Sequence, residues 1–250
     1  MNKKLLVFFT LISILLHHTL FAQNIRVAAA ANLQSVIEVL QKDFKQRTGL
    51  VIEPIVASSG KLVAQISNGA PFDVFLSADM SFPETLFTKG FAVKKPVAYA
   101  AGSLIICSSQ NIGFNNWERV LMSPRVKKIA IANPAIAPYG KAATELLQGK
   151  GILDDIQSKI VYGESISQVN TYITTGVVDV GFTTQALVKE AGNKSALYYQ
   201  IVDHRQYQPI LQGMVLLKHA ADNPAAEKFY RYILSAAAKK IFINYGYRMQ

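Results

Sequence analysis

The stretch whose residues most clearly suit chemistry is Ser58-Ser59-Gly60-Lys61, which lies one residue, Ala57, beyond the strand-like residues 51–56. The apolar spacing after it is typical of a helix face, so we expect a tight turn between a strand and a helix. Such a turn exposes free backbone N–H groups and the positive end of the helix dipole, and two hydroxyls add further donors. These donors favour a small anion as the ligand.

Two other interpretations of this stretch deserve comparison. A nucleotide-binding P-loop needs a glycine five residues before the Gly-Lys pair and a Ser or Thr after it. Here those positions hold Ile55 and Leu62, which argues against a nucleotide site. The second interpretation is that Ser58 and Ser59 merely cap a helix, and this single turn leaves that alternative open.

Three further turns of the same kind are expected at Asn32, Tyr139 and Ile166. Asn32 stands where an N-cap belongs, Tyr139 lies in a Pro-Tyr-Gly turn, and the spacing from Ser165 to Gln168 is that of a capping box. Ligands of open α/β sheets bind beyond the carboxyl ends of the strands, where these turns lie. The four predicted helix starts are therefore expected to face one cleft.

Strand-like and helix-like segments alternate along the chain, which predicts parallel α/β sheets. The long apolar run 96–108, with Gly102 as a bend, is suited to a strand that crosses between two sheets. The strand-like runs 198–202 and 210–217 are expected to return the chain to the first sheet. We therefore predict an α/β protein of two lobes with a ligand cleft between them. The predicted lobes are residues 23–100 plus 206–250, and residues 101–205.

The first 22 residues have the composition of a secretory signal. Lys3 and Lys4 precede an apolar run, residues 5–16, that is too short to span a bilayer, and Ala22 suits the end of a cleaved signal. Cleavage near Ala22 predicts a periplasmic protein of 228 residues. Without those two lysines, the formal net charge of +10 becomes about +8.

Composition also limits the class of function. The basic residues are scattered without an aromatic-interleaved stripe, which argues against nucleic acid as a partner. The only cysteine, Cys107, excludes a disulfide and is expected to be a buried thiol. His204 and His219 lie in no metal-ligand or catalytic spacing, and Asp154-Asp155 resembles a solvated turn. The sequence therefore favours a binding protein over an enzyme, with no metal held directly by side chains; a secreted α/β enzyme with a cleft serine is the alternative.

Several strings of the chain resemble, in order, a known family. They are A-A-A-A-N-L (28–33), A-S-S-G-K-L (57–62), N-G-A-P-F-D-V-F-L-S-A-D (68–79), A-N-P-A-I-A-P-Y-G-K-A (132–142) and Y-G-Y (245–247). This combination, spread over residues 24–248, resembles the periplasmic molybdate-binding proteins of ABC importers.

The resemblance implies a two-lobed type II periplasmic binding protein fold. It also implies that the cleft holds molybdate or tungstate through hydrogen bonds alone, so that the metal is bound as a tetrahedral oxyanion and no cofactor is needed. The implied partner is the permease of an ABC transporter, and the implied state is a monomer. Carried over by motif, the ligand contacts are Asn32, Ser59, and the backbone N–H groups of Tyr139 and Ile166.

The chain departs from the family pattern at two places. Many members have Ser where this chain has Asn32, which we expect to donate through its side-chain amide. Many also have a Tyr near Thr184, so Thr184 is a possible contact, although a helix cap explains it equally well. Ala31 is a possible contact through its N–H. A sulfate-type oxyanion binder remains an alternative, and Glu164 is the one carboxylate expected close enough to affect the choice of anion.

Overall fold

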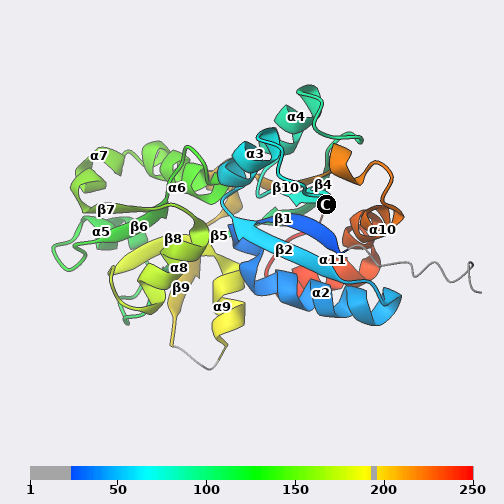
Figure 1. Ribbon diagram of the computed structural model, residues 1–250. Coiled ribbons are helices and arrows are strands. Elements are labelled where there is room, and N and C mark those ends of the chain that lie inside the picture. The colour runs from blue at the N-terminus through cyan, green and yellow to red at the C-terminus, as the bar shows by residue number, and fades with distance from the viewer. Residues whose placement is uncertain (1–23, 193–195, 250) are drawn as a thin grey trace, which may run out of the picture.

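The computed structural model describes residues 24–192 and 196–249, so the predicted signal peptide, residues 1–22, lies outside the described residues. The described chain forms two five-stranded sheets, each covered by helices, which lie side by side as two lobes (Figure 1). None of the helices in these ranges is long and apolar enough to cross a membrane. The predicted two-lobed α/β architecture is thus confirmed.

The sheet of the first lobe has the strand order β2-β1-β3-β10-β4. Its strands are β1 (Ile25–Ala30), β2 (Ile52–Ala57), β3 (Val74–Leu76), β4 (Val97–Gly102) and β10 (Ile210–Leu216). Its helices are η1 (Ala31–Leu33), α2 (Gln34–Thr48), α3 (Ser59–Ser67), α4 (Ser81–Thr88), η4 (Lys218–Ala220), α10 (Pro224–Ile233) and α11 (Ala236–Asn244).

Side chains alternate between the two faces of this sheet, as strand geometry requires. Val27 and Ala29 of β1 pack into the cluster that also contains residues of α2, α10 and α11. Ala28, between them, packs into the opposite cluster with residues of α3 and α4. Because both faces are covered, β1 is apolar at nearly every position, which is why its sequence reads as a short continuous run.

The sheet of the second lobe has the strand order β7-β6-β8-β5-β9. Its strands are β5 (Leu104–Ser108), β6 (Ile129–Ala132), β7 (Ile160–Gly163), β8 (Val180–Thr184) and β9 (Tyr198–Ile201). Its helices are α5 (Trp117–Met122), α6 (Pro138–Gly149), α7 (Leu153–Ile156), η2 (Gln157–Lys159), α8 (Ile166–Thr174) and α9 (Gln185–Ala191), and η3 (His204–Gln206) lies between β9 and β10. Cys107 is fully buried in β5, as predicted, and burial raises the pKa of its thiol to about 12.

Two topological predictions are wrong. The sheets are mixed rather than parallel, because β10 runs antiparallel to β3 and β4, and β5 runs antiparallel to β8 and β9. In addition, β9 belongs to the second sheet, so only β10 returns the chain to the first. Parallel pairing holds where a helix connects two strands of one lobe. The strands β4, β5, β9 and β10 instead carry the chain between lobes, and helix alternation does not determine their direction.

Three buried tyrosines are expected to lower the stability of the protein at alkaline pH. Tyr99, Tyr139 and Tyr247 are each buried, and burial raises the pKa of all three phenols. In the unfolded chain these phenols have a pKa of about 10. Above that pH the unfolded state binds fewer protons than the folded state, so the free energy of unfolding falls as the pH rises.

We therefore expect urea midpoints to be steady below about pH 9 and to fall between about pH 10 and 12. The variant Tyr247→Phe, which lacks one of these phenols, should show a shallower decline. Midpoints that stay constant throughout this range would contradict the role of the buried tyrosines.

Candidate functional site

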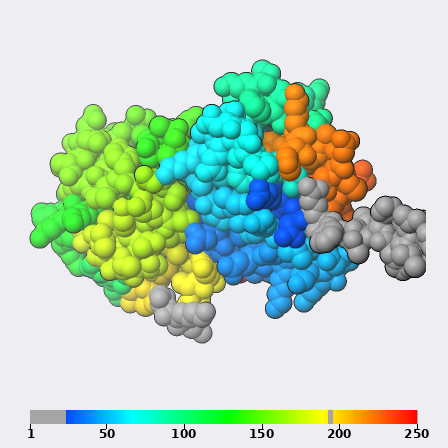
Figure 2. Space-filling model, in the orientation of Figure 1, coloured from blue at the N-terminus to red at the C-terminus, as the bar shows by residue number. Residues whose placement is uncertain are grey.

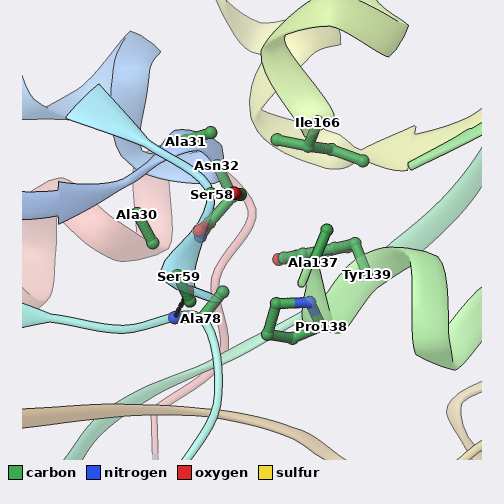
Figure 3. A pocket seen from close by; sticks show the side chains of 10 residues that line it. All are labelled: Ala30, Ala31, Asn32, Ser58, Ser59, Ala78, Ala137, Pro138, Tyr139 and Ile166. Atoms are coloured by element: carbon green, nitrogen blue, oxygen red, sulfur yellow. Dashed lines mark hydrogen bonds between the residues drawn. The ribbon is translucent and has the colours of Figure 1, made fainter. Parts of the chain in front are cut away.

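A pocket lies between the two lobes (Figure 3). It is small, with a cavity volume of about 10 Å³. Its lining comes from both lobes: Ala30, Ala31, Asn32, Ser58, Ser59 and Ala78 from the first, and Ala137, Pro138, Tyr139 and Ile166 from the second. The structure therefore brings together all four predicted contact residues and Ala31. Thr184 is buried at the end of β8 and is not among the lining residues; its side chain makes no helix-cap hydrogen bond either.

Most of the lining residues lie at or beside helix starts, whose first backbone N–H groups have no partner within the helix. The residues that precede η1, α2, α3 and α6 make no side-chain cap hydrogen bond. The start of α8 differs, since Ser165 Oγ accepts from the N–H of Gln168 at 3.3 Å and Gln168 Oε1 accepts from the N–H of Glu164 at 2.7 Å. The helix start at Ile166 and the Ser165 cap are confirmed, although Gln168 reaches the N–H of Glu164 and not that of the N-cap residue, as a full capping box would. Buried helix-start N–H groups without a cap need another acceptor, which an anion in the pocket would supply.

The two serines at the start of α3 do not act as helix caps. Ser58 occupies the N-cap position, but its Oγ is buried and has no hydrogen-bond partner in the described structure. Ser59 Oγ accepts from the N–H of Ala78 at 3.1 Å, which leaves its own proton free to donate. The capping alternative for this turn is therefore wrong, and Ser58 is a buried donor that sequence reasoning did not select.

The Pro-Tyr-Gly turn owes its position to a close approach between helix and strand. Pro138 is the first residue of α6, where its missing N–H costs no helical hydrogen bond. A Cβ on Gly140 would lie 1.9 Å from the carbonyl oxygen of Ala132. Only glycine therefore lets α6 begin directly against the end of β6, and this contact helps to place Tyr139 at the pocket.

Asn32 is positioned by a buried network instead of acting as an N-cap. It is the second residue of η1, and its side-chain amide Nδ2 donates to Gln212 Oε1 at 2.7 Å and to Tyr247 Oη at 3.0 Å. Tyr247 Oη in turn donates to the carbonyl oxygen of Asn32 at 2.8 Å. The N-cap prediction for Asn32 is wrong because the chain forms a 3-10 turn before α2 begins.

The orientation of the Asn32 amide follows from Gln212. Gln212 Nε2 donates to the carbonyl oxygens of Ala78 and Ile210, both at 3.1 Å, so its Oε1 must face Asn32. Gln212 lies at a β-bulge in the pairing of β10 with β4, a feature that often redirects a side chain. Both amide protons of Asn32 are thus engaged, and its Oδ1 is left buried without a partner among the described residues. The predicted donation from the Asn32 side-chain amide to the ligand is therefore not seen; its backbone N–H remains available.

No lining residue carries a charged side chain. Charged residues lie close to the lining residues in sequence: Asp79 follows Ala78, and Lys61, Lys141 and Glu164 each lie two positions from a lining residue. Lys61 Nζ and Glu164 Oε2 lie 2.5 Å apart and form an ion pair between the lobes. Glu164 thus faces a lysine, which reduces its repulsion of an anion. Burial raises the pKa of the Tyr139 phenol, so this ring adds no charge at neutral pH. Among the described residues, no three His, Cys, Asp or Glu side chains cluster as metal ligands would.

Comparison with known proteins agrees with this geometry. Residues 25–248 match the family model described as bacterial extracellular solute-binding protein. The chain belongs to that family. The molybdate-binding protein ModA of Azotobacter vinelandii is 34% identical over 230 residues, which cover 92% of this chain and 91% of the relative. ModA of Rhodobacter capsulatus is 35% identical over 229 residues, with coverages of 90% and 88%.

Solved structures extend the comparison. The Azotobacter vinelandii periplasmic molybdate-binding protein superposes with a TM-score of 0.86 at 34% identity and covers 91% of this chain and 100% of its own. The sulfate-binding protein SubI of Mycobacterium tuberculosis, at 15% identity and a TM-score of 0.73, shows the shared fold alone. The resemblance to molybdate-binding proteins seen in the sequence is confirmed by these matches.

The Asn32 network yields a prediction about stability. Tyr247→Phe removes the acceptor for one Asn32 amide proton and the donor to the Asn32 carbonyl, leaving buried polar groups unpaired. We expect the free energy of unfolding to fall by roughly 1–3 kcal/mol in urea titrations without ligand. The matched control is Tyr162→Phe, because Tyr162 is 46% exposed and its change should be small. An equal effect of the two substitutions would contradict the importance of the network.

Proposed function

We propose that this chain binds molybdate or tungstate in the periplasm and delivers it to the membrane permease of an ABC importer. The observation that carries the proposal is the interlobe pocket itself, which joins four helix starts and two hydroxyls and has no charged side chain in its lining. Relatives that cover nine-tenths of the chain are named as molybdate-binding proteins, which supports this choice of anion.

The proposed contacts are hydrogen-bond donors. They are the N–H groups of Ala31, Asn32, Tyr139 and Ile166 and the hydroxyls of Ser58 and Ser59. A fully ionised oxyanion offers acceptors only, so this set matches it. Asn32 Oδ1, a buried acceptor, is the exception: it is not a proposed contact, because an amide oxygen pairs only with a ligand that carries a proton. Thr184 is left out because it does not line the pocket.

The number of donors is enough for tight binding. Hydrogen bonds to a charged group contribute roughly 1.5–3 kcal/mol each, so about six of them can support a dissociation constant near or below micromolar. Burial strengthens each bond because little water remains in the pocket to compete. The positive ends of the helix dipoles add to the attraction.

An enzyme with a cleft serine is the less supported alternative. Neither Ser58 nor Ser59 is hydrogen-bonded to a histidine or carboxylate in the described structure, as an activated nucleophile would be. His219 pairs with Asp73 at 2.9 Å and His204 lies beside Asp203, and neither lines the pocket. We therefore propose a transport role for a monomeric, secreted protein.

The proposal is tested first by thermal melts. Molybdate and tungstate, each added well above micromolar, should raise the melting temperature, since a ligand that binds only the folded state stabilises it. The two affinities should agree within about tenfold, because the ions share charge and nearly the same size. Sulfate has shorter bonds, so fixed amides can meet it only with overlong hydrogen bonds, and competition titrations should show it to be much weaker.

A melt unmoved by molybdate, tungstate, sulfate and phosphate would overturn the transport role. Sulfate that displaces molybdate at a comparable concentration would instead indicate a sulfate-type binder.

Asn32→Asp should nearly abolish binding of molybdate. The new carboxylate would meet Gln212 Oε1 and Tyr247 Oη where the amide now donates, and it would place a negative charge beside the anion. Calorimetry should show a loss of affinity of at least about a hundredfold, or roughly 2.7 kcal/mol. Asn115→Asp adds the same charge at an exposed position and serves as the control. Equal affinity of Asn32→Asp and the parent would show that Asn32 does not border the bound ion.

A further inference from the structure

The two lobes touch directly around the pocket. The backbone N–H of Gly60, in the first turn of α3, donates to the carbonyl oxygen of Ile136 in the second lobe at 3.0 Å. On the face shown in Figure 2, the cyan segment that contains α3 lies against the green segment of the second lobe. One helix-start donor of α3 is thus used for the other lobe and not for the ligand.

Gly60 leaves no room for a side chain at this contact. A Cβ at position 60 would lie 2.9 Å from Ile136 Cβ and 3.0 Å from Ile136 Cα. These atoms belong to the backbone and its first side-chain carbon, so rotation about a side-chain bond cannot move them away. The backbone of Gly60 is helical and has no positive φ, so alanine would be tolerated there apart from this contact.

Other interlobe contacts lie beside pocket residues in the same way. Ser167 Oγ donates to the carbonyl oxygen of Ala31 at 3.2 Å, and Lys61 pairs with Glu164. Ser167 follows the lining residue Ile166, just as Gly60 follows Ser59. The contacts that hold the lobes together are therefore neighbours in sequence of the residues that line the pocket.

We propose that Gly60 is a positioning residue that determines ligand affinity by allowing the lobes to meet. The inference rests on the proposed function, because it concerns the affinity of the same pocket. Donors from both lobes reach one ion only in the closed arrangement, so apparent affinity scales with the fraction of molecules that can close. A side chain at position 60 acts against closure without touching the ion.

The Gly60 contact should matter more than the neighbouring ion pair. The Lys61 and Glu164 side chains are 46% and 72% exposed, and solvent-exposed pairs contribute little. The Gly60 contact joins two main chains, and an added methyl group cannot be accommodated unless one lobe shifts. Closure is therefore controlled by shape at this point and only slightly by charge.

The test compares Gly60→Ala with the parent and with Gly149→Ala, using the full mature chain and molybdate. Gly149 ends α6, and a Cβ there would meet nothing within 4 Å, so this variant controls for the gain in helix propensity. For Gly60→Ala we expect the dissociation constant to rise at least about tenfold, mainly through faster dissociation measured by stopped flow. Without ligand its urea midpoint should equal or exceed that of the parent.

Unchanged affinity of Gly60→Ala would overturn the inference. So would a loss of affinity accompanied by a lower urea midpoint, because glycine would then be needed for folding and not for closure. A parent that fails to bind molybdate would contradict the proposed function instead; the same comparison would then be made with the anion that gives the largest thermal shift.

Discussion

The structure depends on one electrostatic requirement: backbone N–H groups at buried helix starts must find an acceptor. Three of the four starts at the pocket lack a side-chain cap, and the pocket has no charged side chain to take that place. A buried N–H group without an acceptor costs free energy, and a hydrogen bond from it to an anion removes that cost. The uncapped helix starts therefore lower the stability of the protein without ligand and raise its affinity for an anion. Two sheets whose strands end at the same place are the means of bringing these donors together.

The buried hydrogen-bond network around Gln212 links the pocket residue Asn32 to β10, a strand through which the chain returns from the second lobe to the first. Gln212 lies on β10, the strand that brings the chain back to the first lobe, and it holds both Asn32 and the carbonyl oxygen of Ala78. Tyr247, near the chain end, completes the network through Asn32. Because each donor in the network has one suitable acceptor, the amide orientation of a pocket residue is determined by groups that do not line the pocket.

Local signals predicted much of the fold and of the site. The helix start at Ile166 was predictable because the capping box from Ser165 to Gln168 is local, and the Pro-Tyr-Gly turn was predictable because Pro138 and Gly140 each meet a local steric condition. The antiparallel strands and the role of Gln212 were not, since Gln212 meets Asn32 across 180 residues and no periodicity encodes that contact. Ser58 was considered as a donor but not selected as a ligand contact, because in the sequence it is indistinguishable from a helix cap; only burial without a partner in the described structure separates the two.

Helix geometry explains why the residues that line the pocket are followed by residues that meet the other lobe. Successive residues of an α-helix are rotated by about 100°, so a helix that points its first residue at a pocket points the next one to the side of it. At the start of α3, Ser59 lines the pocket while Gly60 meets Ile136 of the other lobe. At the start of α8, Ile166 lines the pocket while Ser167 meets Ala31. The proposed contact with the ion and the contact between lobes therefore belong to separate, adjacent residues of one rigid helix. On the proposed function, substitutions at the second position of each helix change the contact between the lobes while the lining residues stay in place.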